Sequence, residues 1–244
     1  MLDTVDSKTA GRRAAMDRQK DETILIRVRP RPGAYASGIE TTETILRAAA
    51  DVLIEEGYKS FTLRRVAERS GMKVGNLSYH FPRKEELIRE LLEAILNGFR
   101  EKSAAAIADT GLPPEERIVR LTTLSFREMG TRATTHLFPE LWALASHDEF
   151  VSDQLKQFYT SLLDGMATNL GAVAPQLSSE QCHEIALLLC ATVEGMIVFV
   201  GHDRPWAARR SAMRQLTIKS IISLTKAMEA DARETADAAC ELEK

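Results

Sequence analysis

The sequence predicts an all-α fold, with a small N-terminal helix-turn-helix domain of three helices and a larger C-terminal helical domain. Three observations predict this class. Ala, Leu, Glu and Arg dominate the 244 residues, and all four favour helices. Apolar residues recur at helical spacing in successive segments. Gly and Pro are sparse, and the alternation typical of strands is nearly absent beyond residue 40.

Residues 1–38 are expected to form a flexible, basic N-terminal extension. Helical periodicity is poor there, and Pro and Gly residues interrupt the segment between 30 and 38. Residues 24–29 alternate weakly and could form a short strand. Two interpretations stay open for the extension: a frayed terminus, or an arm that reaches into a DNA groove as homeodomain arms do.

Residues 39–84 have the pattern of a helix-turn-helix, with helices expected at 42–56, 63–70 and 74–80. Thr62 is a suitable N-cap for the second helix, and Gly71 supplies the left-handed conformation that ends it. Small Ala67 lets the second and third helices approach closely, and Leu77 anchors the third helix to the core. This spacing is diagnostic of the motif.

Residues 85–230 are expected to form the C-terminal helical domain, and residues 231–244 a polar tail that frays. The helices of the C-terminal domain are expected from 83 to beyond 100, and at 115–129, 136–145, 148–170, 178–201 and 206–229. Ser178 and Gln181 form a capping box at the start of the most apolar of these helices.

Positive charge is concentrated at the helix-turn-helix, although the whole chain has a formal net charge of -3. Between Gly57 and Lys84 only Glu68 opposes the basic residues Lys59, Arg64, Arg65, Arg69, Lys73, Arg83 and Lys84. A local basic face on an acidic protein favours oriented docking on nucleic acid over diffuse adhesion.

The cysteine pattern and hydropathy indicate a cytoplasmic protein without membrane association. Cys182, Cys190 and Cys240 form no CxxC pair, and no signal-peptide pattern is present. The longest apolar run, residues 185–200, contains Glu194 and a glycine and is too short for a membrane span.

No pattern indicates an enzyme, because nucleophile–base pairing, a phosphate loop and cofactor fingerprints do not occur. No metal site is expected either. Cys182 and Cys190 lie more than two helical turns apart, and HEIAL at 183–187 is not the HExxH zinc motif. The sequence therefore predicts no cofactor.

The segment ILRAAADVLIEEGYKSFTLRRVAERSGMKVGNLSYHFPRKEELI, residues 45–88, resembles the N-terminal domain of TetR/AcrR-family transcriptional regulators. The resemblance implies binding of double-stranded DNA through the helix-turn-helix, and a C-terminal domain that dimerises and binds a small molecule. One departure concerns Ser78. Such regulators usually carry an aromatic residue at this position, whereas here the first aromatic is Tyr79.

The resemblance, combined with the geometry of the major groove, assigns base contacts to the start of the third helix. Lys73 and Asn76 would hydrogen-bond base edges, and Val74 would contact a thymine methyl group. Gly75 would let the backbone approach the DNA closely. Arg64, near the start of the second helix, would reach a guanine edge or a phosphate.

Phosphate contacts set the register of a protein on DNA and are expected from residues around these bases. Thr62, His80 and Lys84 are assigned to the DNA backbone, together with either Ser78 or Tyr79. Which of these two contacts a phosphate stays open, and Tyr79 could instead cap the small core.

The two C-terminal helices, at 178–201 and 206–229, are expected to form a homodimer. Both are apolar over a broad part of their surface, which one subunit of this size covers only in part, and two helices from each partner can make a four-helix bundle. A two-fold dimer also places two recognition helices about 34–36 Å apart, one turn of DNA. The alternative is burial within the monomer.

An effector pocket is expected in the C-terminal domain, with an apolar lining and few polar groups. Its candidate residues are Phe126, Met129, His136, Trp142, Phe158, Met166, Glu194 and Phe199. Aromatic and Met residues at helical spacing are often plain core. Glu194 is different, because an acid among apolar residues must find a partner, water or a ligand group. It could also meet a basic residue across the dimer.

The sequence thus predicts a sequence-specific DNA-binding regulator, most simply a dimeric repressor that a small molecule releases from a palindromic operator. Two other classes stay as alternatives: an all-helical enzyme, and a helix-turn-helix that serves protein contact. The operator, the effector, the target genes and the sign of regulation are not determined by the sequence.

Overall fold

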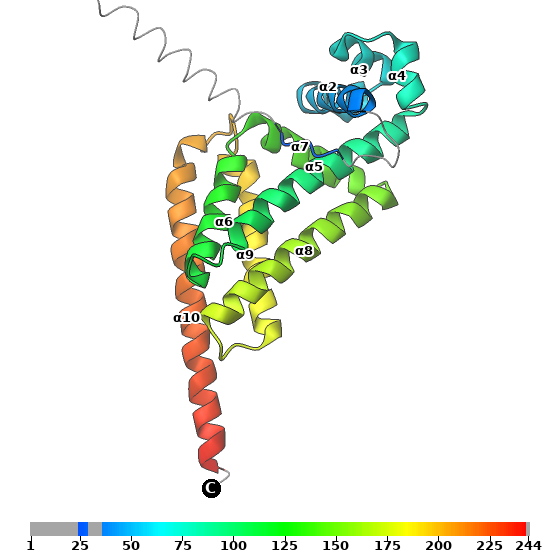
Figure 1. Cartoon of the computed structure of the whole chain (residues 1–244). Coiled ribbons are helices and arrows are strands. Elements are labelled where there is room, and N and C mark those ends of the chain that lie inside the picture. Colours follow the sequence, from blue (N-terminus) through cyan, green and yellow to red (C-terminus); the bar gives the residue numbers. More distant parts are fainter. Residues whose placement is uncertain (1–23, 29–35, 243–244) are drawn as a thin grey trace, which may run out of the picture.

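The computed structural model describes residues 24–28 and 36–242, and every regular element in these ranges is a helix (Figure 1), which confirms the all-α class. The elements are α2 (Ala36–Ser60), α3 (Leu63–Ser70), α4 (Val74–His80), α5 (Lys84–Ile107), α6 (Pro114–Glu128), α7 (Arg132–Ala145), α8 (Glu149–Val173), α9 (Ser179–Val200), the 3-10 helix η1 (Ala207–Arg209) and α10 (Arg210–Leu242).

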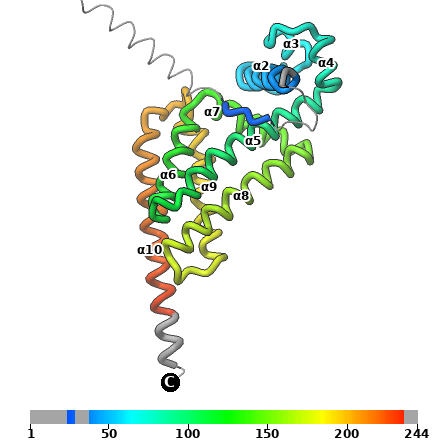
Figure 2. The backbone as a smooth tube through the Cα atoms, viewed as in Figure 1, coloured from blue at the N-terminus to red at the C-terminus, as the bar shows by residue number. Residues whose placement is uncertain are grey.

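The helices form a small head and a larger body that share α5 (Figures 1 and 2). Helices α2, α3 and α4 cluster at one end, and α5 runs from this head into the body, where it packs on α6 and α8. Helix α9 packs mainly on α8, and α10 lies along α6 and α9 with its C-terminal part projecting beyond the other helices. One apolar core runs from α2 through α5 to α9. Head and body are therefore packed together through buried side chains.

Helices α3 and α4 begin and end where the sequence predicts. Helix α3 begins after Thr62, whose side chain accepts a hydrogen bond from the Arg65 amide at 3.1 Å. It ends at Gly71, which has φ 70 and ψ 18, the left-handed conformation that a glycine adopts at little cost. Local signals in the sequence are sufficient to set this turn.

Helices α2 and α7 begin away from their predicted starts. Helix α2 begins at Ala36, ahead of the predicted start at Thr42, and is kinked at Gly57. The Thr42 hydroxyl donates to the Gly38 carbonyl at 2.9 Å, so this threonine bonds within the helix rather than capping it. Helix α7 begins at Arg132, before the predicted His136, because Thr131 accepts from the Thr134 amide and is the N-cap.

Helix α10 continues to Leu242, whereas the sequence predicted an end near 229 and a frayed polar tail over 231–244. No Gly or Pro interrupts this stretch, and its Ala-rich composition favours a helix. Arg233 forms an ion pair with Glu229 at 2.9 Å, at the i,i+4 spacing that supports helices.

Helix α9 has the predicted capping box, with Ser178 and Gln181 bonding each other's backbone amides. Within the described ranges it is the one helix whose length and composition would also allow a membrane span. From the sequence, no membrane span is expected because the apolar run is short. That reason is insufficient, since the helix has 22 residues. A core helix meets the same criteria, and α9 buries Ile185, Leu189 and Ile197 against the body.

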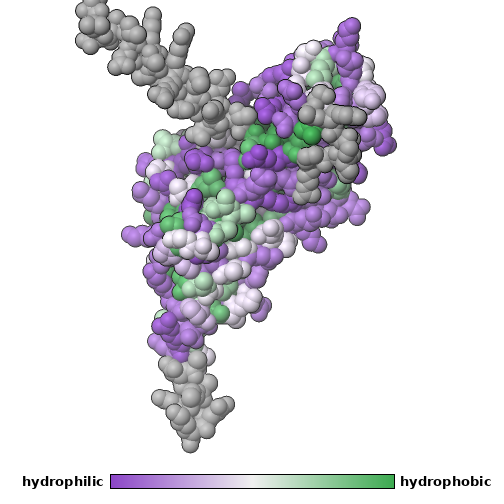
Figure 3. Space-filling view, viewed as in Figure 1, coloured by the Kyte–Doolittle hydropathy of each residue, from purple (hydrophilic) through white to green (hydrophobic). Residues whose placement is uncertain are grey.

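Residues 24–28, here called the N-terminal strap, lie against α5 and differ from the flexible extension or short strand that the sequence predicted. The strap has no regular secondary structure. The Arg27 amide donates to the Ala94 carbonyl at 3.0 Å, and the Arg27 side chain pairs with Glu101 at 2.8 Å. The apolar side chains of Ile24, Ile26 and Val28 pack on the core. Figure 3 shows a hydrophobic patch where the head meets the body. The rest of the predicted extension lies outside the described residues, apart from the start of α2.

Gly98→Ala should release the strap from α5. Gly98 is buried where the strap crosses, and a Cβ there would overlap the Leu25 carbonyl, a backbone group that cannot rotate away. We expect amide hydrogen exchange at Arg27 to accelerate by about tenfold, the equivalent of about 1.4 kcal/mol. Gly75→Ala is the matched control, because no atom lies within 4 Å of a Cβ at Gly75. Unchanged exchange at Arg27 in Gly98→Ala would show that the strap is held elsewhere.

Candidate nucleic-acid interface and internal cavity

The solvent-exposed face of helix α4 carries both polar and apolar side chains. All seven of its residues are described, and Leu77 alone is buried. Lys73, Gly75 and Asn76 are exposed, and the Val74 side chain is 44% exposed, although it is apolar. A hydrophobic side chain held in water next to a cation and an amide suits a surface that reads base edges. The structure thus brings these four predicted residues together at one end of the helix.

The C-terminal end of α4 shows which of Ser78 and Tyr79 projects into solvent. Tyr79 is 86% exposed, the most exposed large hydrophobic residue of the described chain, and its ring meets His80 edge-on at 5.5 Å. Ser78 is half-buried. The alternative that Tyr79 caps the small core is wrong, because so exposed a ring covers no core. Its hydroxyl is free to reach a phosphate, and this outcome favours Tyr79 over Ser78 for that role.

Two predicted phosphate contacts are partly engaged within the protein. Thr62 uses its hydroxyl oxygen to cap α3, although the residue is exposed and the hydroxyl hydrogen stays available. The Lys84 ammonium lies over the Tyr58 ring, 4.1 Å from its centroid, and partial burial lowers the pKa of Lys84. Lys84 is thus a half-buried cation at the first turn of α5, less free than the sequence suggested.

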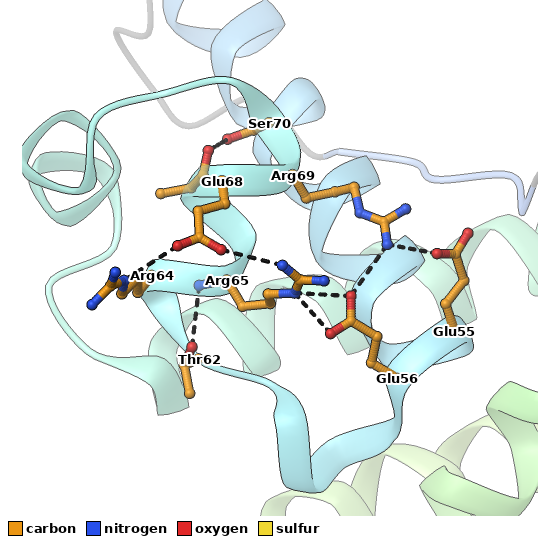
Figure 4. Close-up of polar contacts among 9 residues, drawn as sticks. Glu55, Glu56, Thr62, Arg64, Arg65, Glu68, Arg69 and Ser70 are labelled. Atoms are coloured by element: carbon orange, nitrogen blue, oxygen red, sulfur yellow. Dashed lines mark hydrogen bonds and ion pairs between the residues drawn. The ribbon is translucent and has the colours of Figure 1, made fainter.

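The basic face is narrower than the linear count of charges indicated, because arginines of α3 pair with carboxylates (Figure 4). Arg65 bonds Glu56 of α2 at 2.8 Å, and Arg69 bonds Glu55 at 2.5 Å and Glu56 at 3.2 Å. The Arg69 guanidinium lowers the pKa of Glu55 by hydrogen bonding. These pairs fasten α3 to α2, and they take both guanidinium groups away from the set of candidate DNA ligands.

The remaining basic residues divide into paired and unpaired groups. Arg64 pairs with Glu68 at 3.2 Å and Arg83 with Glu86 at 2.7 Å, both on exposed surfaces where such pairs are weak. Lys59 and Lys73 are exposed and have no ion-pair partner among the described residues. Arg64 can therefore exchange its partner for a phosphate at little cost, and Lys73 is the unpaired cation at the N-cap of α4.

A cavity of about 70 Å³ lies inside the body between α5, α6, α7, α8 and α9. Its walls are mostly apolar, and each helix contributes: Phe99, Leu121, Phe138, Phe158, Met166 and Ile197 are among the lining residues. Lys102 and Glu128 form an ion pair at 3.0 Å in the lining. The free volume is smaller than that of typical ligand pockets, about 300–1,000 Å³, so a ligand must push these helices or side chains apart.

The second polar feature of the cavity is Glu194 of α9. The Tyr159 hydroxyl of α8 lies beside its carboxylate, and Trp142 Nε1 of α7 donates to the Tyr159 oxygen at 3.0 Å. Burial raises the pKa of Glu194 to about 7, and the Tyr159 hydroxyl offsets part of this rise. No cation of the described chain forms an ion pair with Glu194.

Met129, Phe158, Met166 and Glu194, four of the residues predicted for an effector pocket, line this cavity. The other four lie elsewhere. Phe126 is buried in the core outside the cavity, and Phe199 is 52% exposed and packs on Trp206. His136 is exposed on α7 and does not line the cavity. Trp142 reaches the cavity only through Tyr159.

These corrections share a cause: helical spacing indicates that a residue faces inward but not which neighbour it meets. The prediction also missed Tyr159, Lys102 and Glu128 as polar groups at or beside the cavity. Lys102 and Glu128 are separated by 26 positions, and no sequence pattern pairs them. A tyrosine among apolar residues, four positions from Leu155 and Leu163, was the available signal for Tyr159.

Comparison with known proteins agrees with this architecture. The family model for bacterial regulatory proteins of the tetR family matches residues 45–91. An uncharacterized HTH-type transcriptional regulator from the dhlA 5' region of Xanthobacter autotrophicus is 31% identical over 166 residues, which cover 64% of this chain and 78% of that protein. The transcriptional repressor KstR2 of Mycolicibacterium smegmatis is 30% identical over 90 residues, 37% of this chain and 43% of the repressor.

Solved structures share the fold at lower identity. A putative transcriptional regulator from Saccharomonospora viridis, solved in complex with choline, superposes with a TM-score of 0.65 at 20% identity, covering 75% of this chain and 96% of that chain. A putative TetR-family regulator from Mesorhizobium loti has the same TM-score at 14% identity, covering 78% and 98%. At these identities the likeness concerns the fold alone.

Proposed function

This chain belongs to the TetR family of bacterial regulatory proteins, which are DNA-binding transcriptional regulators and not enzymes, and we propose that it is a dimeric repressor released from a palindromic operator by a small-molecule effector. It would act in the cytoplasm without membrane association. A repressor occurs among the relatives, which supports repression over activation.

The observation that carries the proposal is the exposed face of α4. Lys73, Val74 and Asn76 stand in solvent beside each other, while Leu77 holds the helix to the core. A helix fits the major groove, where each base pair presents a distinct set of donors, acceptors and methyl groups. Tyr79 and Arg64 would flank these contacts on the phosphates. The two arginines bound to Glu55 and Glu56 would take no part.

Exposed apolar side chains on α9, on α10 and at Trp206, just before η1, support dimerisation. Outside α4, every exposed large hydrophobic residue of the described chain lies between 187 and 216: Leu187, Leu188, Val198, Phe199, Trp206 and Leu216. Such a patch marks an interaction surface. A two-fold axis through the α9 and α10 faces would cover it and would place two copies of α4 on successive turns of DNA.

Helix α5 supports the coupling between effector and DNA. Its first turn lies at the head, where Lys84 contacts Tyr58, and its later residues Phe99 and Lys102 line the cavity. A ligand larger than the free 70 Å³ would displace cavity walls, and α5 would carry that displacement to the head. The two heads would then lose the spacing that matches the operator, and the effector would lower DNA affinity by its differential binding to the two arrangements.

Lys73→Ala should flatten the salt dependence of DNA binding, whereas Arg69→Ala should not. An operator duplex is first selected from random DNA with the purified protein. On that duplex, the slope of log affinity against log salt should fall by about one unit per chain for Lys73→Ala, because one cation that displaces counterions at the DNA surface is lost. Arg69→Ala keeps the wild-type slope, since its guanidinium is bound to Glu55 and Glu56. Fluorescence anisotropy at several salt concentrations measures both slopes.

The same titrations test the other parts of the proposal. Two or more chains per duplex and a palindromic selected sequence are expected. Equal slopes for the two variants would contradict the assignment of Lys73 to the DNA surface. Failure of the wild-type protein to select any duplex would contradict DNA reading by α4 altogether.

A further inference from the structure

Within mostly apolar walls, the cavity has one carboxylate without an ion-pair partner, that of Glu194. The other carboxylate of the lining, Glu128, is paired with Lys102, and the Thr122 and Ser125 hydroxyls donate to the Ile118 and Leu121 carbonyls. The Tyr159 hydroxyl is the one polar neighbour that lowers the pKa of Glu194. An ionised carboxylate can accept about four hydrogen bonds. Glu194 therefore keeps a large unused capacity to accept them.

Polar contacts link Trp142 and Tyr159 to this carboxylate. Trp142 of α7 donates to Tyr159 of α8, which leaves the Tyr159 hydrogen for Glu194 of α9. Three helices thus hold the acid, although its burial is unfavourable. Replacing these polar side chains by apolar ones would remove the cost of burying a charge, so their presence points to a role in recognition rather than in stability.

The groups packed around Glu194 leave its charge uncompensated. On α9, burial and the neighbouring Glu194 raise the pKa of Cys190 to about 12, so its thiol is neutral. On α8, burial raises the pKa of Tyr159, so its phenol is neutral. Across the cavity, the α5 ammonium of Lys102 is bound to the α6 carboxylate of Glu128. A positive charge beside Glu194 would meet no unpaired cation in the described lining, because Lys102 is bound to Glu128.

We propose that the effector of this regulator is a slim apolar molecule with one protonated amine, and that Glu194 binds the ammonium while the aromatic and aliphatic walls bind the body. The assignment deepens the proposed ligand-responsive function and rests on it. An ammonium group provides donors and a charge opposite to the carboxylate, in a setting where the low dielectric strengthens both. A fatty acid would bring a second anion to the same place, and an alcohol would supply a donor without charge.

Proton release is a signature of this mode of binding. Because the pKa of Glu194 is about 7, the free protein carries a proton there for much of the time at neutral pH. An ammonium ligand favours the ionised form and expels that proton. The affinity for the amine should therefore increase as the pH rises towards 7, by up to about tenfold per pH unit. Above pH 7 it should level off.

The test uses three probes with the same six-carbon body: n-hexylammonium, n-hexanol and hexanoate. Isothermal titration calorimetry at pH 7 on the full-length dimer compares them, in two buffers of different ionisation enthalpy to count released protons. We expect n-hexylammonium to bind at least about tenfold more tightly than n-hexanol, with proton release. Glu194→Gln, which keeps the shape of the side chain, should abolish this preference and the proton release.

Glu184→Gln is the control, because it removes the same charge from an exposed position on the same helix and should keep the preference for the amine. The proposal is overturned if n-hexylammonium does not bind, if the three probes bind equally, or if Glu194→Gln keeps the preference. DNA binding is measured separately on the selected duplex. Loss of probe discrimination with DNA binding intact refutes only the amine class, whereas a protein that selects no duplex refutes the proposed function.

Discussion

Leu77→Ala should lower the free energy of unfolding by about 2–5 kcal/mol and remove DNA binding. Leu77 has no exposed surface and is the one buried residue of α4. A seven-residue helix is not stable by itself in water, so α4 depends on this side chain for its position and for its existence. The truncation leaves a cavity in the small core of the head and frees the helix from α2 and α3.

The measurement is urea unfolding at fixed protein concentration, together with anisotropy on the selected duplex. Val74→Ala is the matched control on the same helix: its side chain is 44% exposed, so stability should change by less than about 0.5 kcal/mol. Its DNA affinity should still fall, because a contact to a thymine methyl is lost. An unfolding free energy for Leu77→Ala within about 1 kcal/mol of wild type would mean that other contacts hold α4.

The helix-turn-helix was predictable because its determinants are local. Thr62 caps α3 through a bond to a residue three positions away, and Gly71 ends the same helix by its own backbone conformation. Leu77 is recognisable as an anchor from its spacing to Gly71 and Ala67. Each of these signals acts within one turn or one loop, so a single sequence contains the whole interaction.

The electrostatics of the head were not predictable in the same way. The sequence counts Arg65 and Arg69 as part of a basic face, but their partners Glu55 and Glu56 belong to the preceding helix. These ion pairs join residues 9 and 14 positions apart, across a bend whose angle the sequence does not state. A charge total over a segment therefore overestimates the charge that is offered to a partner.

The cavity shows the same limit for apolar residues. Periodicity correctly marks Phe126 as buried and Phe158 as buried, yet only Phe158 lines the cavity. Which buried residue borders the cavity depends on how the side chains of five helices fit together in space. Glu194 was identifiable because burying an acid is costly whatever the packing, so its chemistry marks it before its neighbours are known.

The stability of the wild-type protein should fall as the pH rises from about 4.5 to about 7, by up to about 3 kcal/mol from Glu194 alone. The pKa of this carboxyl rises from its ordinary value of 4.5 to about 7 in the folded protein, chiefly by burial. The folded state therefore binds a proton that the unfolded state has released between these pH values. The contribution is fully present below pH 4.5, is lost progressively up to about pH 7, and stays lost above it.

Glu194→Gln isolates this contribution, because every other titrating group is common to both proteins. Its stability relative to wild type should rise by up to about 3 kcal/mol between pH 4.5 and pH 8 in urea unfolding. Glu184→Gln should track the wild type at each pH, since that carboxyl is exposed. A flat difference between Glu194→Gln and wild type would mean that Glu194 titrates normally in the folded protein.

The same carboxylate links this pH dependence to the proposed effector. At pH 8 the ionised Glu194 lines the cavity, half-buried and without a counter-ion among the described residues, which is the state that an ammonium ligand stabilises most. Saturating n-hexylammonium should therefore raise the Tm of the wild type at pH 8 more than at pH 5, because at pH 5 the ligand must first expel a proton. Glu194→Gln should show equal and small shifts at both pH values. A larger shift at pH 5 would contradict the role of the ionised carboxylate, since binding would then favour its protonated form.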